Sequence, residues 1–280
     1  MIRALVTGAT GFTGRYVTPL LEGLGFEVHG LSRKDCDIRD AAAVRATVAA
    51  INPHYVLHLA GTSNFPDSHA DAMYSINVQG TVNLLEACAR LAERPRKVIL
   101  VSSCYVYGGT GSKPADENSA LESTGAYGKS KREMEHAAAG WYERLPILIV
   151  RPFNYTGVGH GEQFFVPKLV RVFRQRGTDA SFVQPNVIRD YSDVRWVAKT
   201  YVDLLARPES STVVNICSGV GIPLGKLVSI LEQLTGHRVT GRPKALDGIS
   251  LVGSPARLLT MLGTPSPFSM EDTLRWMLAA

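Results

Sequence analysis

The stretch that decides the fold of this 280-residue chain is Thr7-Gly8-Ala9-Thr10-Gly11-Phe12-Thr13-Gly14. It follows the apolar run Ile2–Thr7 at once and opens a helical pattern that we predict to span Gly11–Leu24. In such a strand–turn–helix unit the first glycine permits the tight turn, the second lets the backbone approach a pyrophosphate, and the third lets the helix pack closely on the strand. The helix N-terminus adds N–H groups and a positive dipole end. The stretch therefore predicts a dinucleotide site.

Beyond this turn, short apolar runs alternate with amphipathic helical patterns, which is typical of βαβ units. The apolar runs are nearly continuous, so we expect strands buried on both faces of a parallel sheet. The predicted fold class is α/β, a doubly wound (Rossmann) sheet. The predicted strands are Ile2–Thr7, Glu27–Leu31, Tyr55–Leu59, Lys97–Val101, Ile147–Arg151 and Val213–Ile216. The predicted helices are Gly11–Leu24, Ala41–Ile51, Ile76–Leu91, Ala126–Leu145 and Val194–Leu205.

The alternation loosens after Asn154, where glycine, proline and basic residues become frequent. We expect a smaller C-terminal substrate lobe that is interleaved with the sheet domain. The predicted division gives residues 1–154 and 190–216 to the dinucleotide-binding domain, and residues 155–189 and 217–280 to the lobe. Two further helices are predicted there, over Leu224–Leu234 and Met270–Leu278.

The second predicted strand leads into Ser32-Arg33-Lys34. An acidic residue about 20 positions after the glycines would bind the ribose hydroxyl of NAD, whereas cations there accommodate the 2′-phosphate of NADP. The cations Arg33 and Lys34 come first, and Asp35 and Asp37 follow. The order favours NADP over NAD, although both cations could also be surface loop charges.

The segment Tyr127-Gly-Lys-Ser-Lys131 places a tyrosine and a lysine one helical turn apart. Helical spacing puts both on the apolar stripe that continues through Met134 and Ala138 to Trp141 and Leu145, so both face inward. A buried ammonium is costly without a partner. A cation one turn away also stabilises a phenolate, and a tyrosine pKa lowered by about 3 units would need about 4 kcal/mol. Such a tyrosine suits general acid–base chemistry at a hydroxyl or carbonyl group.

Together, the TGxxGxxG turn and the YxxxK pair resemble the extended, nucleotide-sugar branch of the short-chain dehydrogenase/reductase superfamily. The match to its SSxxVYG motif over residues 102–108 implies a catalytic triad of Ser103, Tyr127 and Lys131. The resemblance further implies cofactor contacts from Gly8, Gly11, Phe12, Thr13, Gly14, Arg33, Lys34, Asp37, Ile38, Leu59, Ala60, Gly61, Asn77, Tyr127 and Lys131. It implies substrate contacts from Thr62, Ser103, Asn154 and Arg189, with no metal.

Two departures discriminate within this family. Its 4,6-dehydratases carry an Asp-Glu pair directly after the catalytic Ser or Thr, where this chain has Cys104 and Tyr105, so dehydration is rejected. The family's arginine-bearing segment near the C-terminus is reduced to Arg242-Pro-Lys244-Ala-Leu-Asp247, which leaves the residue that grips the distal phosphate open. The segments at 187–194, 215–219 and 253–258 look most like GDP-4-keto-6-deoxy-D-mannose reductases.

The resemblance thus implies an NADPH-dependent reductase of a GDP-linked 4-keto-6-deoxy sugar, with a role in deoxysugar and lipopolysaccharide biosynthesis. An NAD-dependent nucleotide-sugar 4-epimerase with the same triad is the alternative. A non-catalytic NADP sensor on the same fold is disfavoured because tyrosine and lysine are both present. By analogy with relatives we expect a homodimer, paired as a four-helix bundle through Ile76–Leu91 and Ala126–Leu145.

The composition of the chain argues against several kinds of site and partner. Thirty basic and 25 acidic residues give a net charge of +5, which suits phosphate-bearing small molecules but is too thinly spread to predict nucleic-acid binding. The four cysteines are scattered, which argues against a disulfide framework and a structural zinc and favours a reducing compartment. Neither a signal peptide nor a stretch of about 20 apolar residues is apparent, so we expect a cytoplasmic protein without a membrane partner.

Overall fold

The computed structural model describes residues 1–63, 70–111, 113–208, 210–240 and 250–280. The chain is organised in two compact units. The first comprises Met1–Gly108, Ser119–Pro152 and Ala198–Asn215, and the second comprises Gly109–Asn118, Phe153–Val197 and Ile216–Ala280. The short stretch Gly109–Asn118 thus belongs with the second unit, a grouping that the sequence pattern did not indicate.

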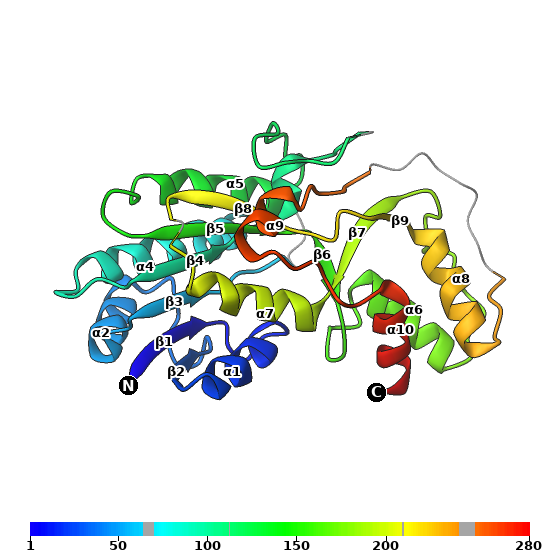
Figure 1. The fold of residues 1–280 in the computed structure, drawn as a ribbon, viewed down its shortest axis with the longest axis horizontal. Helices are drawn as coiled ribbons and strands as arrows, with labels where there is room; N and C mark the ends of the chain where they lie inside the picture. Colours follow the sequence, from blue (N-terminus) through cyan, green and yellow to red (C-terminus); the bar gives the residue numbers. More distant parts are fainter. Residues whose placement is uncertain (64–69, 112, 209, 241–249) are drawn as a thin grey trace. The chain divides into compact units, whose positions relative to one another are not determined.

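The first unit is built on a six-stranded sheet with the strand order β2-β1-β3-β4-β5-β8 (Figure 1). The neighbours from β2 to β5 pair in parallel, as predicted. The strands are β1 (Ile2–Thr7), β2 (Phe26–Leu31), β3 (Tyr55–His58), β4 (Lys97–Val101), β5 (Ile147–Pro152) and β8 (Thr212–Ile216). Strand β1 lies between β2 and β3, so the chain reverses its direction of winding there. This is the switch point at which open α/β sheets bind ligands.

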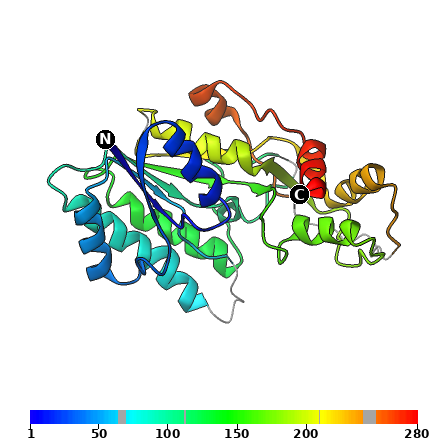
Figure 2. The ribbon, with the colours of Figure 1, turned by 90° about the horizontal axis from the view of Figure 1, so that it is seen from below.

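Helices cover both faces of this sheet. Helices α2, α4 and α5 share one face, where Val48, Leu84 and Met134 pack on strand residues such as Leu5 and Val98. Figure 2 shows α1 on the opposite side of the sheet from α2 and α4. The helices of this unit are α1 (Gly14–Gly23), α2 (Ala41–Ile51), α3 (Ala70–Tyr74), α4 (Gly80–Ala89) and α5 (Ala126–Ala139), with most of α7 (Val194–Leu205). A π-helical turn (Ser75–Gln79) and a 3-10 helix (Cys104–Tyr107) complete it.

The second unit has its own three-stranded sheet and apolar core. Its strands are β6 (Asn154–Thr156), β7 (Ile188–Asp193) and β9 (Gly221–Pro223), in the order β6-β7-β9. Its helices are α6 (Phe165–Arg174), α8 (Leu224–Thr235), α9 (Ala256–Leu262) and α10 (Met270–Ala279). Leu169 and Phe173 of α6 pack with Leu227 and Leu231 of α8 and with Leu274 of α10. Among the described residues, no helix is both long and apolar enough to cross a membrane.

The predicted elements are confirmed with adjusted bounds. Helix α5 ends at Ala139, not at Leu145, because Gly140 is a poor helix former and caps the helix. Helix α1 begins three residues later than predicted, because Gly11 still belongs to the turn, where its N–H donates to the Gly8 carbonyl. The helix predicted over Ile76–Leu91 is interrupted by the π-helical turn and ends at Ala89. The three strands of the second unit were not predicted.

The glycines of the turn are required by sterics at two positions. Gly8 has φ +72°, and a Cβ on it would lie 2.9 Å from the backbone nitrogen of Ala60. A Cβ on Gly14 would overlap the carbonyl oxygens of Gly8 and Ala9. These contacts are to backbone atoms, which cannot rotate away, so the turn holds α1 against β1 only with glycine there.

We therefore expect Gly14→Ala to lower the free energy of unfolding by at least about 2 kcal/mol. Gly23→Ala in the same helix is the matched control, since a Cβ there meets no heavy atom within 4 Å. It should leave stability unchanged or raise it by up to about 1 kcal/mol. Urea denaturation measures both variants. Equal effects of the two substitutions would contradict the steric explanation.

Candidate active site

Helix α5 carries the predicted Tyr-Lys pair on its inward side. Lys131 is 7% exposed, and its ammonium donates a hydrogen bond of 2.8 Å to the carbonyl of Val101, the last residue of β4. Tyr127 is partly buried, and its ring meets that of Tyr105 edge-on at 6.0 Å between centroids. Burial lowers the pKa of Lys131 from its usual 10.5 to about 8, against the opposing effect of the Glu135 charge. The predicted buried lysine is thus observed, with a backbone carbonyl as its hydrogen-bond partner.

Asn77 links the end of β3 to this helix. Its Nδ2 donates to the carbonyl of Thr62 and to Ser130 Oγ, both at 3.0 Å, while its Oδ1 accepts from the Thr62 N–H at 2.9 Å. Ser130 in turn donates to the carbonyl of Tyr127 at 2.8 Å. A Cβ on Gly61 would lie 3.1 Å from both Asn77 Oδ1 and Lys131 Nζ. The structure therefore brings Gly61, Thr62 and Asn77 together with the Tyr-Lys helix.

A buried histidine continues this network to the glycine turn. Thr81 donates its hydroxyl proton to the carbonyl of Asn77 at 2.7 Å, so it accepts from His58 Nε2 at 3.0 Å. Nδ1 of His58 then accepts from Thr7 Oγ1 at 2.7 Å, and Thr7 accepts from the N–H of Ala60. Burial and the Lys131 charge lower the pKa of His58 to about 3, so its ring is neutral. The hydroxyl and imidazole groups of Thr7, His58 and Thr81 are all hydrogen-bonded, which joins the ends of β1 and β3 rigidly.

Ser103 stands between β4 and the 3-10 helix Cys104–Tyr107. It is 5% exposed, and its Oγ caps that helix by accepting from the N–H of Tyr105 at 3.2 Å. A Cβ on Gly128 would overlap the carbonyl oxygen of Tyr105, so α5 packs closely on this helix. The three residues of the predicted triad therefore lie on two elements in direct contact.

A pocket of about 320 Å³ lies at the switch point and has the lining expected of a dinucleotide site. The space above Gly11 is open apart from the Gly8 carbonyl oxygen at 3.1 Å, which leaves room for a phosphate. Leu59 and Ala60 contact Gly8, and Phe12 and Thr13 lead into α1. Predicted cofactor residues in the lining are Gly8, Gly11, Arg33, Asp37, Ile38, Ala60 and Gly61.

The charged end of this pocket is formed by the loop after β2. Asp37 accepts from Arg39 at distances down to 2.5 Å and lies 3.7 Å from the exposed Arg33. Arg39 thereby lowers the pKa of Asp37 to about 2. Asp35 folds back onto the N–H and hydroxyl of Ser32, and Lys34 is exposed. Both carboxylates are thus engaged within the loop.

Of the four predicted substrate residues, Asn154 and Arg189 lie in the second unit. Asn154 begins β6 and pairs in register with Tyr191 of β7, and its buried Oδ1 finds no hydrogen-bond partner within the described chain. An unsatisfied buried amide oxygen is costly and is consistent with a ligand contact. Arg189, on β7, donates to the carbonyl of Ile188 at 2.9 Å. The segment Arg242–Asp247 lies outside the described residues.

Sequence reasoning missed Glu135 and Arg39. Glu135 is buried one turn after Lys131. A glutamate on the inward side of a predicted helix needs a buried partner, and Arg151 near the end of β5 was the sequence signal that could have indicated one. Arg39 lines the cofactor pocket six residues after Arg33. All four cysteines are buried and none forms a disulfide among the residues that the structure describes, where no group of three potential metal ligands occurs either.

The first unit is therefore a Rossmann-type fold with a pocket of about 320 Å³ at its switch point and a Tyr-Lys pair typical of NAD(P)-dependent enzymes. The chain belongs to the NAD dependent epimerase/dehydratase family, whose model matches residues 4–217. This confirms the predicted fold and enzyme class.

Two known enzymes and one solved structure are similar to this chain over most of its length. The chain is 27% identical over 275 residues to GDP-6-deoxy-D-talose 4-dehydrogenase of Aggregatibacter actinomycetemcomitans, covering 96% of this chain and 94% of that protein. It is 28% identical over 243 residues to GDP-6-deoxy-D-mannose reductase of Pseudomonas aeruginosa, covering 81% and 80%. The structure of RMD from Pseudomonas aeruginosa complexed with NADPH superposes with a TM-score of 0.88 at 25% identity, covering 100% of this chain and 97% of that one.

The lowered pKa of Lys131 predicts how stability changes with pH. Its folded pKa of about 8 lies below its unfolded value of 10.5, so the unfolded state binds the proton more tightly between these values. The wild type should therefore become more stable relative to Lys131→Met as the pH rises from 8 to 10.5, by up to about 3 kcal/mol. At pH 7 the variant should be the more stable protein.

The measurement is the free energy of unfolding across this pH range. Lys129→Met, on the exposed side of α5, is the control and should run parallel to the wild type. A parallel curve for Lys131→Met as well would show that the ammonium is not desolvated in the folded chain.

Proposed function

We propose that this protein reduces the C4 keto group of a nucleotide-linked 4-keto-6-deoxyhexose with NADPH, and that the nucleotide is GDP. The observation that carries the proposal is the buried Lys131 ammonium, which lies one helical turn after Tyr127. It donates a hydrogen bond to the carbonyl of Val101, and Val101 lies two residues before Ser103. Two GDP-deoxyhexose oxidoreductases among the similar proteins support the substrate class.

The proposed chemistry divides among three side chains. Ser103 donates a hydrogen bond to the keto oxygen and orients it. Tyr127 donates its proton to the alkoxide that develops at that oxygen, and the Lys131 ammonium favours the phenolate that remains. Lys131 also holds the nicotinamide ribose. When bound, the reduced nicotinamide supplies a hydride to C4. Asn154 and Arg189 bind the substrate's sugar and diphosphate.

NADP is the proposed cofactor because of the loop after β2. In NAD enzymes an acidic side chain at this place receives the ribose hydroxyl, whereas arginine accommodates a 2′-phosphate. Here Asp35 is engaged by Ser32 and Asp37 by Arg39, while Arg33 is 76% exposed at the pocket. NADPH in the similar RMD structure supports the same choice.

Dehydration is not proposed, because the positions of the family's acid and base hold Cys104, which is 1% exposed, and the phenol of Tyr105. Epimerisation is the second candidate, favoured by the family description itself.

A homodimer paired through α4 and α5 is also proposed. A molecular mass of one chain, measured by light scattering, would refute it.

Purified protein should oxidise NADPH stoichiometrically with a GDP-4-keto-6-deoxyhexose and use NADH at least about tenfold less efficiently. Tyr127→Phe should lower kcat at least about 100-fold, because it removes the proton donor. Because the aromatic ring is kept, its dissociation constant for NADPH, measured by fluorescence, should change far less than kcat. Tyr105→Phe, on the neighbouring ring, is the control and should retain turnover.

Two outcomes would overturn this function. Interconversion of two nucleotide sugars without net cofactor consumption would identify an epimerase. Full activity of Tyr127→Phe would remove the proposed acid.

A further inference from the structure

A buried ion pair lies directly behind the proposed catalytic residues. Arg151, at the end of β5, donates to Glu135 of α5 through Nε at 2.9 Å and through Nη2 at 2.6 Å. Both residues are less than 8% exposed. Replacing a buried ion pair with apolar residues is often neutral or stabilising. Stability alone therefore does not explain a charged pair at this position.

The pair is tied to both flanks of Ser103. On one side, Ser102 Oγ donates to Glu135 Oε1 at 2.5 Å, and the Ser102 N–H donates to the carbonyl of Val150. On the other side, Arg151 Nη1 donates to the hydroxyl of Tyr107 at 2.9 Å, and that hydroxyl donates to Asn215 Oδ1 at 2.7 Å.

Ser102 and Tyr107 are each 1% exposed. The residue before Ser103 and the end of the 3-10 helix that Ser103 caps are thus held by one ion pair.

Glu135 also lies one helical turn after Lys131, on the same buried side of α5. Its charge stabilises the Lys131 ammonium. The other titratable groups of this region include Tyr127 on the same helix and His58 on β3, whose neutral ring bears no compensating charge. They also include Arg151 on β5, whose cation pairs with Glu135. Asn77 and the Val101 carbonyl supply only dipoles. Glu135 is therefore the negative charge that opposes the desolvation of Lys131 in this set.

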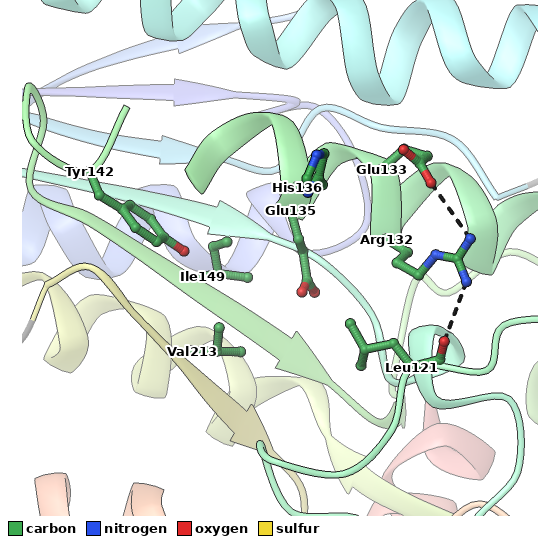
Figure 3. A pocket seen from close by; sticks show the side chains of 8 residues that line it. All are labelled: Leu121, Arg132, Glu133, Glu135, His136, Tyr142, Ile149 and Val213. Carbon is green, nitrogen blue, oxygen red and sulfur yellow. Dashed lines mark hydrogen bonds and ion pairs between the residues drawn. The ribbon is translucent and has the colours of Figure 1, made fainter. Parts of the chain in front are cut away.

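Figure 3 shows the carboxylate of Glu135 directed from α5 into a cavity of about 480 Å³ that also receives the Tyr142 side chain. Burial raises the pKa of Tyr142, and the Glu135 charge adds to this effect while the Arg151 charge opposes it. In the same view, the neighbouring Glu133 turns toward Arg132. The two glutamates share a helix but differ in burial and partners.

We propose that Glu135, anchored by Arg151, is a positioning residue that holds Ser103 in its catalytic place through Ser102 and keeps Lys131 in its charged form. The inference rests on the proposed function for the catalytic roles of Ser103 and Lys131. Glu135 itself is not assigned any contact with substrate or cofactor.

The test compares Glu135→Gln with the matched control Glu133→Gln. Glu135→Gln keeps the size of the side chain but removes its charge, so the Lys131 ammonium should titrate about one pH unit lower. Carbon-13 NMR of labelled lysine side chains measures this in the ligand-free protein. The alkaline limb of the pH profile of kcat should shift to lower pH by the same amount. The maximal kcat should fall about 10- to 100-fold with little change in KM. Glu133→Gln should match the wild type in all three measurements.

A second variant distinguishes a loss of positioning of Ser103 from a loss of folding. Glu135→Leu combined with Arg151→Met replaces the pair with apolar side chains and should keep the thermal midpoint near that of the wild type. Its kcat should still be lowered at least about tenfold, because the bonds from Glu135 to Ser102 and from Arg151 to Tyr107 are lost on the two flanks of Ser103. Wild-type kcat in this double variant, or an unchanged Lys131 titration in Glu135→Gln, would overturn the proposal.

The NMR titration separates this inference from the proposed function. If the wild type fails to reduce any 4-keto sugar but the Lys131 titration shifts in Glu135→Gln alone, the proposed substrate is wrong and the electrostatic role of Glu135 stands. If the wild type reduces the sugar and the Lys131 titration does not shift, the proposed function stands and the electrostatic role of Glu135 is wrong.

Discussion

The burial of one ammonium group is the constraint on which the organisation of the first unit depends. Lys131 is 7% exposed, and burial alone would strip a lysine of its charge. The fold opposes this cost with a carbonyl from the end of β4 and a carboxylate one helical turn away. Both of these groups are themselves held in place, by the sheet and by Arg151 respectively. Groups from β4, β5 and α5 therefore surround this charge and offset part of the cost of burying it.

The same region shows why the strand ends, not the strand interiors, carry polar side chains. Strand interiors such as Leu5 and Val98 pack against α2, α4 and α5 and have no freedom to bind anything. At the strand ends, by contrast, Thr7 and His58 join a hydrogen-bonded chain that reaches Asn77 and the Tyr-Lys helix. Because Thr81 donates to the Asn77 carbonyl and accepts from His58, this series of hydrogen bonds fixes the tautomer of the histidine and the separation of the strand ends.

Much of the fold could be predicted because its signals are local. The glycines at 8 and 14 are required by contacts within a few residues or with the adjoining strand, and the apolar runs coincide with β1 and β4 at both bounds. The second unit was less predictable, because its strands β6 and β9 have only three residues each and carry no alternating pattern. The end of α5 was placed too late, because the apolar stripe continues past Gly140 into a turn that packs on the same core.

The sequence by itself determined the fold of the first unit, the glycine turn and the Tyr-Lys spacing, because helical periodicity and glycine sterics act over a few residues. Only the tertiary structure decided which groups surround them. Glu135, Arg151 and Ser102 come from three separate segments of the chain. An inward-facing glutamate signals a buried partner, but the local sequence does not show that these three residues share one network. Likewise, the engagement of Asp37 by Arg39 depends on how the loop after β2 turns back on itself. Interactions of this kind are set by the packing of elements against each other, and periodicity along the chain carries no record of them.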